Sequence, residues 1–378
     1  MQDGRGEGAG LRYPVLDALR GLAALGVVFH HIPANAGLSA AGFDANFGRM
    51  VDLFFVLSGF VIAASYGAKL SSGFSISRFL WLRWGRVWPL HATMLVVLAV
   101  AMLALGLARP DLRTHGLMAG ANDPADLPLA VLLLQGIVPS RGPTWNHPSW
   151  SISVEMLLYV LAALGWRLLG DRAWGAWLGA ALALLAFAGF GPGFDGLASN
   201  IARGVAGFGL GVLVHRALGQ SRPRLNLHAA TALELAALAT LAWVLSASGN
   251  LAAFDLAAAA LVALAAVQRG LVSRALMFAP FQWLGTISYA LYMVHIFVIG
   301  RSFDILALVQ DRLGLTIAQA TIGGEDVLIG PGWQADIAKL AIMALCLVIA
   351  IPFAKLIEQP ARAWSRRTFG QQLPNAGN

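Results

Sequence analysis

The sequence predicts an all-α polytopic membrane protein with about ten transmembrane helices and both termini in the cytoplasm. Of its 378 residues, 58% are hydrophobic and only 12% are charged, and the mean hydropathy is +0.69. A soluble domain carries about 25% charged residues. Apolar runs of the length needed for one membrane crossing recur along the chain. Lys and Arg concentrate in every second connection, as the positive-inside rule requires.

The predicted spans are the apolar runs 15–34, 50–67, 87–107, 150–169, 174–191, 197–214, 228–247, 251–267, 282–300 and 336–354. The run 128–138 is too short to span and lies between prolines, so we expect an interfacial or re-entrant piece. With the N-terminus inside, eighteen of the 26 Lys and Arg residues fall in cytoplasmic segments. We expect a cytoplasmic segment 1–13, a membrane domain 14–366 and a flexible tail 367–378.

Composition also limits the classes of function. The net charge of +7 does not indicate nucleic acid binding, because the cations lie in short connections rather than on one stripe. One cysteine, Cys346, excludes an intramolecular disulfide and a cysteine zinc cluster. We therefore expect neither a metal nor a nucleic acid partner. The Ala- and Leu-rich region 174–267 has almost no polar content within its spans and indicates a scaffold.

The first span reads "LDALRGLAALGVVFHH". Asp17 lies three residues before Arg20, at pairing distance on a helix. His31 follows Arg20 by eleven residues, so it returns to within ~20° of the same face, ~16 Å along the axis. His30 points ~80° away from that face. Ionisable residues inside spans indicate function, although an interfacial ion pair and an interfacial histidine are the alternative.

The second span carries Asp52 at its outer end and the small pair Ser58–Gly59 in its middle. Small residues let a backbone or a ligand approach closely. In the following connection, Arg83 and Arg86 would face together if helical. Paired arginines suit bidentate phosphate contacts, whereas the positive-inside rule alone would also place cations there.

The fourth and ninth spans contain further polar residues. Glu155 lies one to two turns inside the fourth span, where a carboxylate must be paired, protonated or functional. Trp150 lies at the outer mouth of that span. In the ninth span, Ser288, Tyr292 and His295 form one polar stripe. Interhelical hydrogen bonding is the alternative interpretation of the stripe.

Six stretches in chain order resemble the acyltransferase-3 family of bacterial membrane O-acyltransferases. They are "LDALRGLAALGVVFHH", "VDLFFVLSGFVI", "RWGRVWPL", "WSISVEMLLY", "ISYALYMVHI" and "LIEQPARAW". The resemblance covers residues 14–366. The sequence departs from the family pattern at Ala18, where a glycine is common, and in its second histidine, His30.

The resemblance implies transfer of an acyl group, usually acetyl, from cytoplasmic acyl-CoA to a carbohydrate hydroxyl at the outer face of the bacterial inner membrane. The family's arginine and histidine have ten residues between them, which matches Arg20 and His31 and not His30. Its Phe-Phe-x-x-Ser-Gly element matches the stretch that ends in Ser58 and Gly59. Its arginine pair before a proline matches Arg83, Arg86 and Pro89, and its Trp-Ser-x-x-x-Glu element matches Trp150, Ser151 and Glu155.

We hypothesise that Arg20, Arg83 and Arg86 hold the phosphates of the CoA donor, and that the acyl arm passes Ser58 and Gly59. His31 would act as general base on the acceptor hydroxyl, with Glu155 orienting it or carrying a proton. Asp17, through its pair with Arg20, is grouped with these two as catalytic. The predicted substrate-binding residues are Asp52, Trp150, Tyr292 and His295. An acyl-histidine intermediate is a second route.

Two other functions fit the same residues. A transporter or flippase would use the intramembrane Arg, His and Glu residues as a relay, but we find no inverted repeat. A non-catalytic relative would only bind a lipid-linked glycan. The acceptor, a carbohydrate or lipid-linked glycan, is not identified by the sequence. The outer loops 108–149 and 301–335 either select it or are connectors. Membrane lipids are expected partners, and the oligomeric state stays open.

Overall fold

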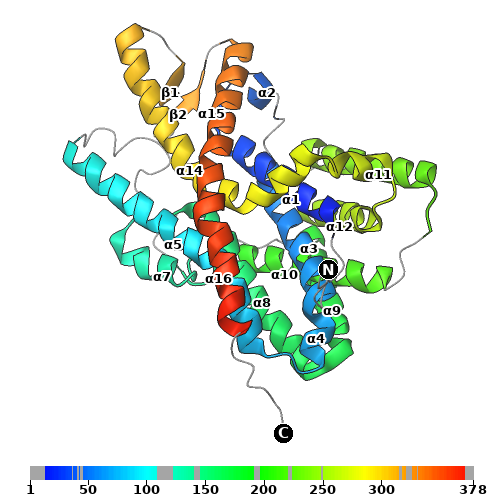
Figure 1. Cartoon of the computed structure of the whole chain (residues 1–378). Helices are drawn as coiled ribbons and strands as arrows, with labels where there is room; N and C mark the ends of the chain where they lie inside the picture. The colour runs from blue at the N-terminus through cyan, green and yellow to red at the C-terminus, as the bar shows by residue number, and fades with distance from the viewer. Residues whose placement is uncertain are drawn as a thin grey trace, which may run out of the picture.

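The computed structural model describes residues 13–35, 37–40, 42, 46–108, 122–139, 145–190, 196–219, 224–247, 250–314, 317–320, 326–329 and 331–370. Most of the predicted N-terminal segment and tail, and parts of both long outer loops, lie outside these residues. The described chain is a helical bundle with one short antiparallel hairpin (Figure 1). This architecture confirms the predicted all-α class.

Helices occupy all ten predicted spans. They are α1 (Pro14–His30), α3 (Met50–Ile62), α5 (Ile76–Ala108), α8 (Trp150–Leu169), α9 (Ala173–Phe190), α10 (Gly196–Leu218), α11 (Leu227–Ala247), α12 (Leu251–Val267), α14 (Ala279–Leu313) and α15 (Gly332–Phe353). Short elements complete the fold: α2 (Gly37–Ala40), η1 (Phe47–Arg49), η2 (Ala63–Gly67), α4 (Ala68–Ser71), η3 (Pro124–Asp126), α7 (Leu127–Val131), η4 (His147–Ser149), η5 (Gly170–Arg172), α13 (Leu271–Leu276), β1 (Ala318–Ala320), β2 (Asp326–Leu328), η6 (Ala354–Glu358) and α16 (Gln359–Gly370).

Seven helical segments within the described residues are long and apolar enough to cross a membrane, and one of them, His147–Ala186, contains both α8 and α9. Helix α12 is apolar but shorter. Helix α1 has 17 residues and carries the Asp17 and Arg20 charges in its first two turns. A multi-pass membrane protein is therefore confirmed, while the count of ten crossings and the orientation of the termini stay predictions.

The segment that was predicted to connect the second and third spans is largely helical. Helix α5 begins at Ile76 rather than at residue 87, so Arg83 and Arg86 lie on a helix and not in a connection. The 33 residues of α5 extend ~50 Å, well beyond the ~30 Å hydrocarbon core. The cations near its start lower the local hydropathy of a helix that continues outside the apolar layer.

The segment predicted to be interfacial or re-entrant forms α7 and a series of turns that pack against α5. The Trp88 indole donates to the Val131 carbonyl at 2.9 Å, and buried His91 contacts the Ala130 carbonyl at 2.7 Å through Nε2. These two bonds satisfy carbonyls at the end of a five-residue helix. The expected short, non-spanning piece is thus present.

The centre of the bundle is built on close helix crossings at glycines. A Cβ on Gly21 of α1 would lie 2.8 Å from the Gly285 nitrogen of α14, and a Cβ on Gly285 would lie 2.5 Å from the Asp17 carbonyl oxygen. A Cβ on Gly59 of α3 would overlap the Phe208 carbonyl oxygen of α10. Small residues at membrane-helix contacts allow this approach of backbones. Both crossings place polar side chains of several helices around one interior space.

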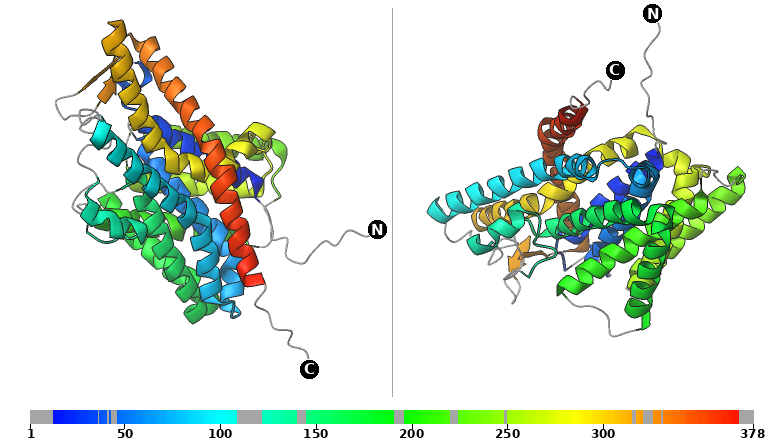
Figure 2. Two further views of the ribbon diagram at one scale, coloured as in Figure 1. Left: turned by 60° about the vertical axis from the view of Figure 1, so that its left-hand side comes forward. Right: turned by 90° about the horizontal axis from the view of Figure 1, so that it is seen from below.

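The segment that follows His31 is held by the outer hairpin and by α15. The Asn35 amide donates to the Leu328 carbonyl, and the Leu328 amide donates to the Pro33 carbonyl, each at 3.0 Å. The Leu38 amide donates to the Asp336 carboxylate at 3.1 Å. The hairpin lies between the ends of α14 and α15, which run side by side in both views (Figure 1, Figure 2). These contacts fix where α1 ends.

Helix α15 continues through the π-helical turn η6 into α16, which lies along α5 (Figure 1). The contact is close, because a Cβ on Gly85 of α5 would lie 2.8 Å from the Ser365 hydroxyl oxygen. As a result, the polar face of α16 lies beside the arginines of α5. Single-turn π-helical segments are frequent at functional sites.

Candidate functional site

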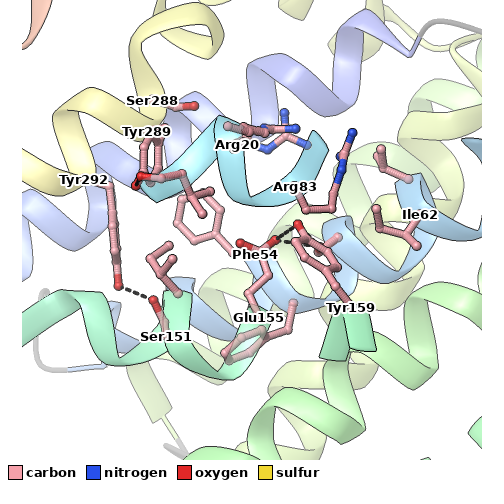
Figure 3. Close-up of a pocket in the computed structure, with 16 residues that line it drawn as sticks. Arg20, Phe54, Ile62, Arg83, Ser151, Glu155, Tyr159, Ser288, Tyr289 and Tyr292 are labelled. Atoms are coloured by element: carbon pink, nitrogen blue, oxygen red, sulfur yellow. Dashed lines mark hydrogen bonds between the residues drawn. The ribbon is translucent and has the colours of Figure 1, made fainter. Parts of the chain in front are cut away.

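A cavity with an empty volume of about 710 Å³ lies among α1, α3, α5, α8 and α14. Its apolar lining comes mostly from α3, and its polar lining from all five helices (Figure 3). The lining residues with polar side chains are Arg20, Ser58, Arg83, Arg86, Ser151, Glu155, Tyr159, Ser288, Tyr289 and Tyr292. The structure therefore brings together eight polar residues, named from four separate motifs and the ninth-span stripe, around one space.

Glu155 is the only carboxylate among the residues that line this cavity. Its Oε1 accepts hydrogen bonds from the Ser58 hydroxyl at 2.7 Å and from the Tyr159 hydroxyl at 2.5 Å. Tyr159 lies one helical turn after Glu155 and is buried. Figure 3 shows this cluster with Arg83 on one side and Tyr292 on the other. Of the expected states of Glu155, which were paired, protonated or functional, the structure shows a hydrogen-bonded carboxyl group whose partners are Ser58 and Tyr159.

The three predicted arginines meet at the same end of the cavity. Arg20 donates to the Asp17 carboxylate at 2.8 Å, which confirms the predicted pairing. Arg83 donates to the Tyr66 hydroxyl at 3.2 Å, and its guanidinium carbon lies 5.0 Å from the centre of the Tyr66 ring. Arg86 has no hydrogen bond or ion pair with any residue that the structure describes. Its guanidinium is therefore available to an anionic ligand.

His31 lies at the opposite end of α1, as the helical geometry predicts. Its Nδ1 lies 2.8 Å from the Val27 carbonyl oxygen. A carbonyl only accepts, so Nδ1 carries the proton and donates it. The neutral ring then has an unprotonated Nε2, which has no hydrogen-bond partner within the described residues. This tautomer is the one that a general base requires.

Two ring contacts connect His31 with the cavity. The rings of His31 and His295 lie 5.1 Å apart, and those of His295 and Tyr292 lie 5.7 Å apart. The Tyr292 hydroxyl lies 2.9 Å from the Ser151 hydroxyl oxygen and donates to the Pro148 carbonyl at 2.9 Å. Because Tyr292 lines the cavity and His31 does not, Tyr292 and His295 form the boundary between the cavity and His31.

His295 is fully buried and has one unsatisfied nitrogen. Its Nδ1 contacts the Tyr292 carbonyl oxygen at 2.7 Å, and its Nε2 has no hydrogen-bond partner in the described structure. His147 lies near enough for its charge to act on both His31 and His295. His30 instead faces η1, where a Cβ on Gly48 would lie 3.0 Å from the His30 Nε2. The two adjacent histidines thus have different surroundings.

Asp52 was predicted to bind substrate, but its carboxylate lies in a buried ion pair instead. Its carboxylate is fully buried and accepts from Arg203 Nε at 2.8 Å and from Arg203 Nη2 at 2.9 Å. The guanidinium of Arg203 also lies 5.1 Å from the centre of the Trp150 ring. Both Asp52 oxygens are therefore engaged, and Trp150 packs between Arg203 and Phe55. The pair links α3 to α10 and has a structural role.

Three further predictions need correction. Glu155 was expected to orient His31 or to carry a proton; its hydrogen bonds go to Ser58 and Tyr159, so it does not orient His31, and proton transfer stays a prediction. Asp17 was grouped with His31 as catalytic, yet fourteen residues of helix separate them, ~21 Å. Gly59 was expected to leave room for the donor, but it faces the Phe208 backbone of α10. Helix-to-helix packing, rather than ligand access, explains the glycine.

Several polar residues were not predicted. The region 174–267 was expected to be a scaffold, yet it supplies Arg203 and Asp255. Asp255 is fully buried, and neither carboxylate oxygen has a hydrogen-bond partner among the described residues. Tyr159 of α8, whose hydroxyl lies near that of Ser58 of α3, was also not predicted. The signal for Arg203 and Asp255 was present, since any ionisable residue within a span is a candidate.

Comparisons with known proteins identify the family of the chain. The family model described as an acyltransferase domain, Acyl_transf_3, matches residues 13–356. The chain is 34% identical over 165 residues to protein 2 in the picA locus of Rhizobium radiobacter, which covers 40% of this chain and 81% of that protein. It is 31% identical over 169 residues to the acyltransferase MdmB of Streptomyces mycarofaciens, which covers 42% of this chain and 40% of that protein. No solved structure matches the chain significantly.

The family match extends over nearly all of the described bundle, from the first residue before α1 to the turn η6. It includes every residue that lines the cavity, as well as His31 and His295. The chain therefore belongs to the acyltransferase-3 family of membrane acyltransferases.

Proposed function

We propose that this protein transfers an acyl group, usually acetyl, from acyl-CoA in the cytoplasm to a carbohydrate or glycan hydroxyl at the outer side of the bacterial inner membrane. The observation that carries the proposal is the arrangement along α1. An unpartnered histidine nitrogen lies at one end, and a cavity with three arginines lies at the other. Membership of an acyltransferase family sets the transporter interpretation aside.

The arginine end is assigned to the donor. A CoA thioester is a long polyanion, and guanidinium groups bind phosphate oxygens in bidentate geometry. Arg86, which has no hydrogen bond or ion pair with the described residues, is the strongest candidate, beside Arg20 and Arg83. The apolar lining of Phe54, Val61 and Ile62 suits the slim acyl-bearing arm. Cations concentrate on this side of the membrane in the predicted topology, which supports a cytoplasmic entry.

The reaction is assigned to the histidine end. The acceptor oxygen attacks the thioester carbonyl carbon while His31 Nε2 takes the hydroxyl proton. The carbon–sulfur bond then breaks, and the proton is passed to the thiolate sulfur, so CoA leaves as a thiol. The Val27 carbonyl holds the His31 ring in the required tautomer. In this scheme Tyr292 and His295 separate the arm from the acceptor until transfer.

The test uses the purified full-length chain in sealed vesicles. Acetyl-CoA carrying a labelled acetyl group is supplied on one side only, and glycan acceptors are supplied on either side. We expect label to reach acceptors on the side opposite the donor. Transfer only to acceptors on the donor's own side would contradict the transmembrane direction. Uptake of intact acceptor without acyl transfer would contradict the enzymatic function.

A further inference from the structure

A second cavity, with an empty volume of about 1100 Å³, adjoins the first at its arginine end. Both cavities are lined by Arg20, Val61, Arg86, Ser288 and Tyr289. The second is far more polar and draws on η6 and α16 as well as α1, α5 and α14. The residues that line only this cavity are Asp17, Gln282, Gly285, Thr286, Glu358, Gln359, Arg362 and Arg366. The donor-site hypothesis named neither Arg362, which lies in the stretch "LIEQPARAW", nor Arg366.

The charges around this second cavity do not balance. Four guanidinium groups, those of Arg20, Arg86, Arg362 and Arg366, face the two carboxylates of Asp17 and Glu358, which gives 4 − 2 = +2. Each carboxylate forms an ion pair with one arginine: Asp17 with Arg20 at 2.8 Å, and Glu358 with Arg362 at 3.3 Å. The other two arginines, Arg86 and Arg366, form no ion pair in the described structure, although the Glu155, Glu358 and Asp17 carboxylates lie near enough to act on Arg86.

The arginines are also close enough to repel one another. The positive charges of Arg86, Arg366 and Arg20 all act on the Arg362 guanidinium. Like charges held together at the edge of a low-dielectric region are unfavourable. A bound polyanion would offset this repulsion and gain charge-assisted hydrogen bonds. The cluster is therefore arranged for a ligand that carries more than one negative charge.

The packing of α16 places two of its arginines at the second cavity. Arg362 and Arg366 are four residues apart on α16 and share one face. The close contact of Gly85 with Ser365 sets this helix against α5, next to Arg86. Glu358 is 2% exposed, and its Oε2 has no hydrogen-bond partner in the described residues. A buried free acceptor in a cavity of donors indicates that a ligand N–H also binds there.

We propose that this cavity binds the nucleotide end of the donor, with Arg86, Arg362 and Arg366 as its phosphate-binding residues. This inference rests on the proposed function. A CoA thioester carries a diphosphate and a ribose phosphate at its nucleotide end, and an uncharged arm at its acyl end. The polar cavity fits the first and the adjoining, more apolar cavity fits the second. The free Glu358 oxygen offers an acceptor for the amino group of the nucleobase.

The same chemistry could bind the phosphate of an anionic lipid headgroup. The experiment therefore uses the full-length protein in nanodiscs of phosphatidylcholine alone, and in nanodiscs that also contain phosphatidylglycerol. The probe is adenosine 3′,5′-bisphosphate, which has the base, the ribose phosphate and one of the two diphosphate groups of the donor but no arm. Its Kd is measured by calorimetry for the native chain, for Arg366→Ala and for Arg367→Ala. Arg367 is an exposed neighbour that does not line the cavity.

We expect the probe to bind the native chain in both lipid compositions. Arg366→Ala should weaken binding about 10-fold or more, as loss of one charge-assisted phosphate contact implies. Arg367→Ala should stay within about twofold, because Arg367 does not line the cavity, although it is exposed like Arg366. Arg362→Ala is a less direct test, because it also leaves the buried Glu358 carboxylate without its ion pair.

A second readout separates binding from folding. Arg366→Ala should lower the ratio of kcat/KM for acetyl-CoA over kcat/KM for S-acetylpantetheine about 10-fold. An equal loss for both donors would indicate a structural role and overturn the assignment. Probe binding that occurs only without anionic lipid would show a headgroup site and also overturn it. If the native chain binds the probe through Arg366 but transfers no acyl group, the proposed function fails while the nucleotide site stands.

Discussion

The buried pair of Asp52 and Arg203 offers a quantitative test of the structure. Arg203→Met removes the cation and leaves the Asp52 carboxylate fully buried, where it now has no partner. Two hydrogen bonds, at 2.8 and 2.9 Å, are lost. Removing one partner of a buried pair costs about 3–5 kcal/mol. The Arg203 guanidinium also interacts with a second buried carboxyl group, that of Asp255. Because Arg203→Met removes both interactions, we expect a loss of stability in the upper half of that range.

The assay is the free energy of unfolding, measured by SDS titration in mixed micelles. The double variant Asp52→Asn with Arg203→Met should recover about 2 kcal/mol or more of the loss, because a neutral pair leaves no uncompensated charge. Arg216→Met is the matched control. Arg216 is an exposed arginine on the same helix, and its loss should change stability by less than about 1 kcal/mol.

Two results would refute this reasoning. The first is an unchanged free energy of unfolding for Arg203→Met, which would mean that Asp52 is not buried as described. Alternatively, the fold could stay intact while the KM for the acceptor rises more than 10-fold. That second outcome would restore the substrate-binding role that the sequence suggested for Asp52.

Three other predictions follow from the same contacts. Gly59→Ala should destabilise the protein by about 1–3 kcal/mol, because its Cβ would overlap the Phe208 carbonyl oxygen; Gly165→Ala, on an open part of α8, should be neutral or stabilising by up to about 1 kcal/mol in the same SDS titration. Arg86→Ala should raise the KM for acyl-CoA about 10-fold and leave the acceptor KM within twofold, whereas equal changes in both would contradict the donor assignment. Tyr292→Phe should cost about 1–2 kcal/mol, because it removes the hydroxyl that donates to the Pro148 carbonyl; unchanged stability would show that this bond is not made.

The sequence predicted those features that depend on local geometry. The ion pair of Asp17 with Arg20 needs only helical spacing of three, and the separation of His30 from His31 needs only the helical repeat. Hydropathy located every long helix, but not where α5 begins, since Arg83 and Arg86 interrupt the apolar pattern without interrupting the helix.

The features that were not predicted depend on tertiary contacts. Asp52 meets Arg203 across 151 residues of sequence, and no spacing rule connects them. Gly59 and the Ser58 hydroxyl are adjacent, yet one faces α10 and the other faces Glu155. The approach of α16 to α5 likewise follows from packing at Gly85. Sequence patterns identified the polar residues, and only the fold shows which of them meet.

The central claim is that His31 Nε2 is the general base for acyl transfer. The most direct measurement compares the kcat of purified His31→Ala and His30→Ala with that of the native chain, using labelled acetyl-CoA and the glycan acceptor. Circular dichroism and gel filtration would verify that both variants are folded. We predict a 100- to 10,000-fold loss for His31→Ala, the typical contribution of a general base, and a change of less than about threefold for His30→Ala. Near-normal turnover by folded His31→Ala, or an equal loss in both variants, would contradict this account.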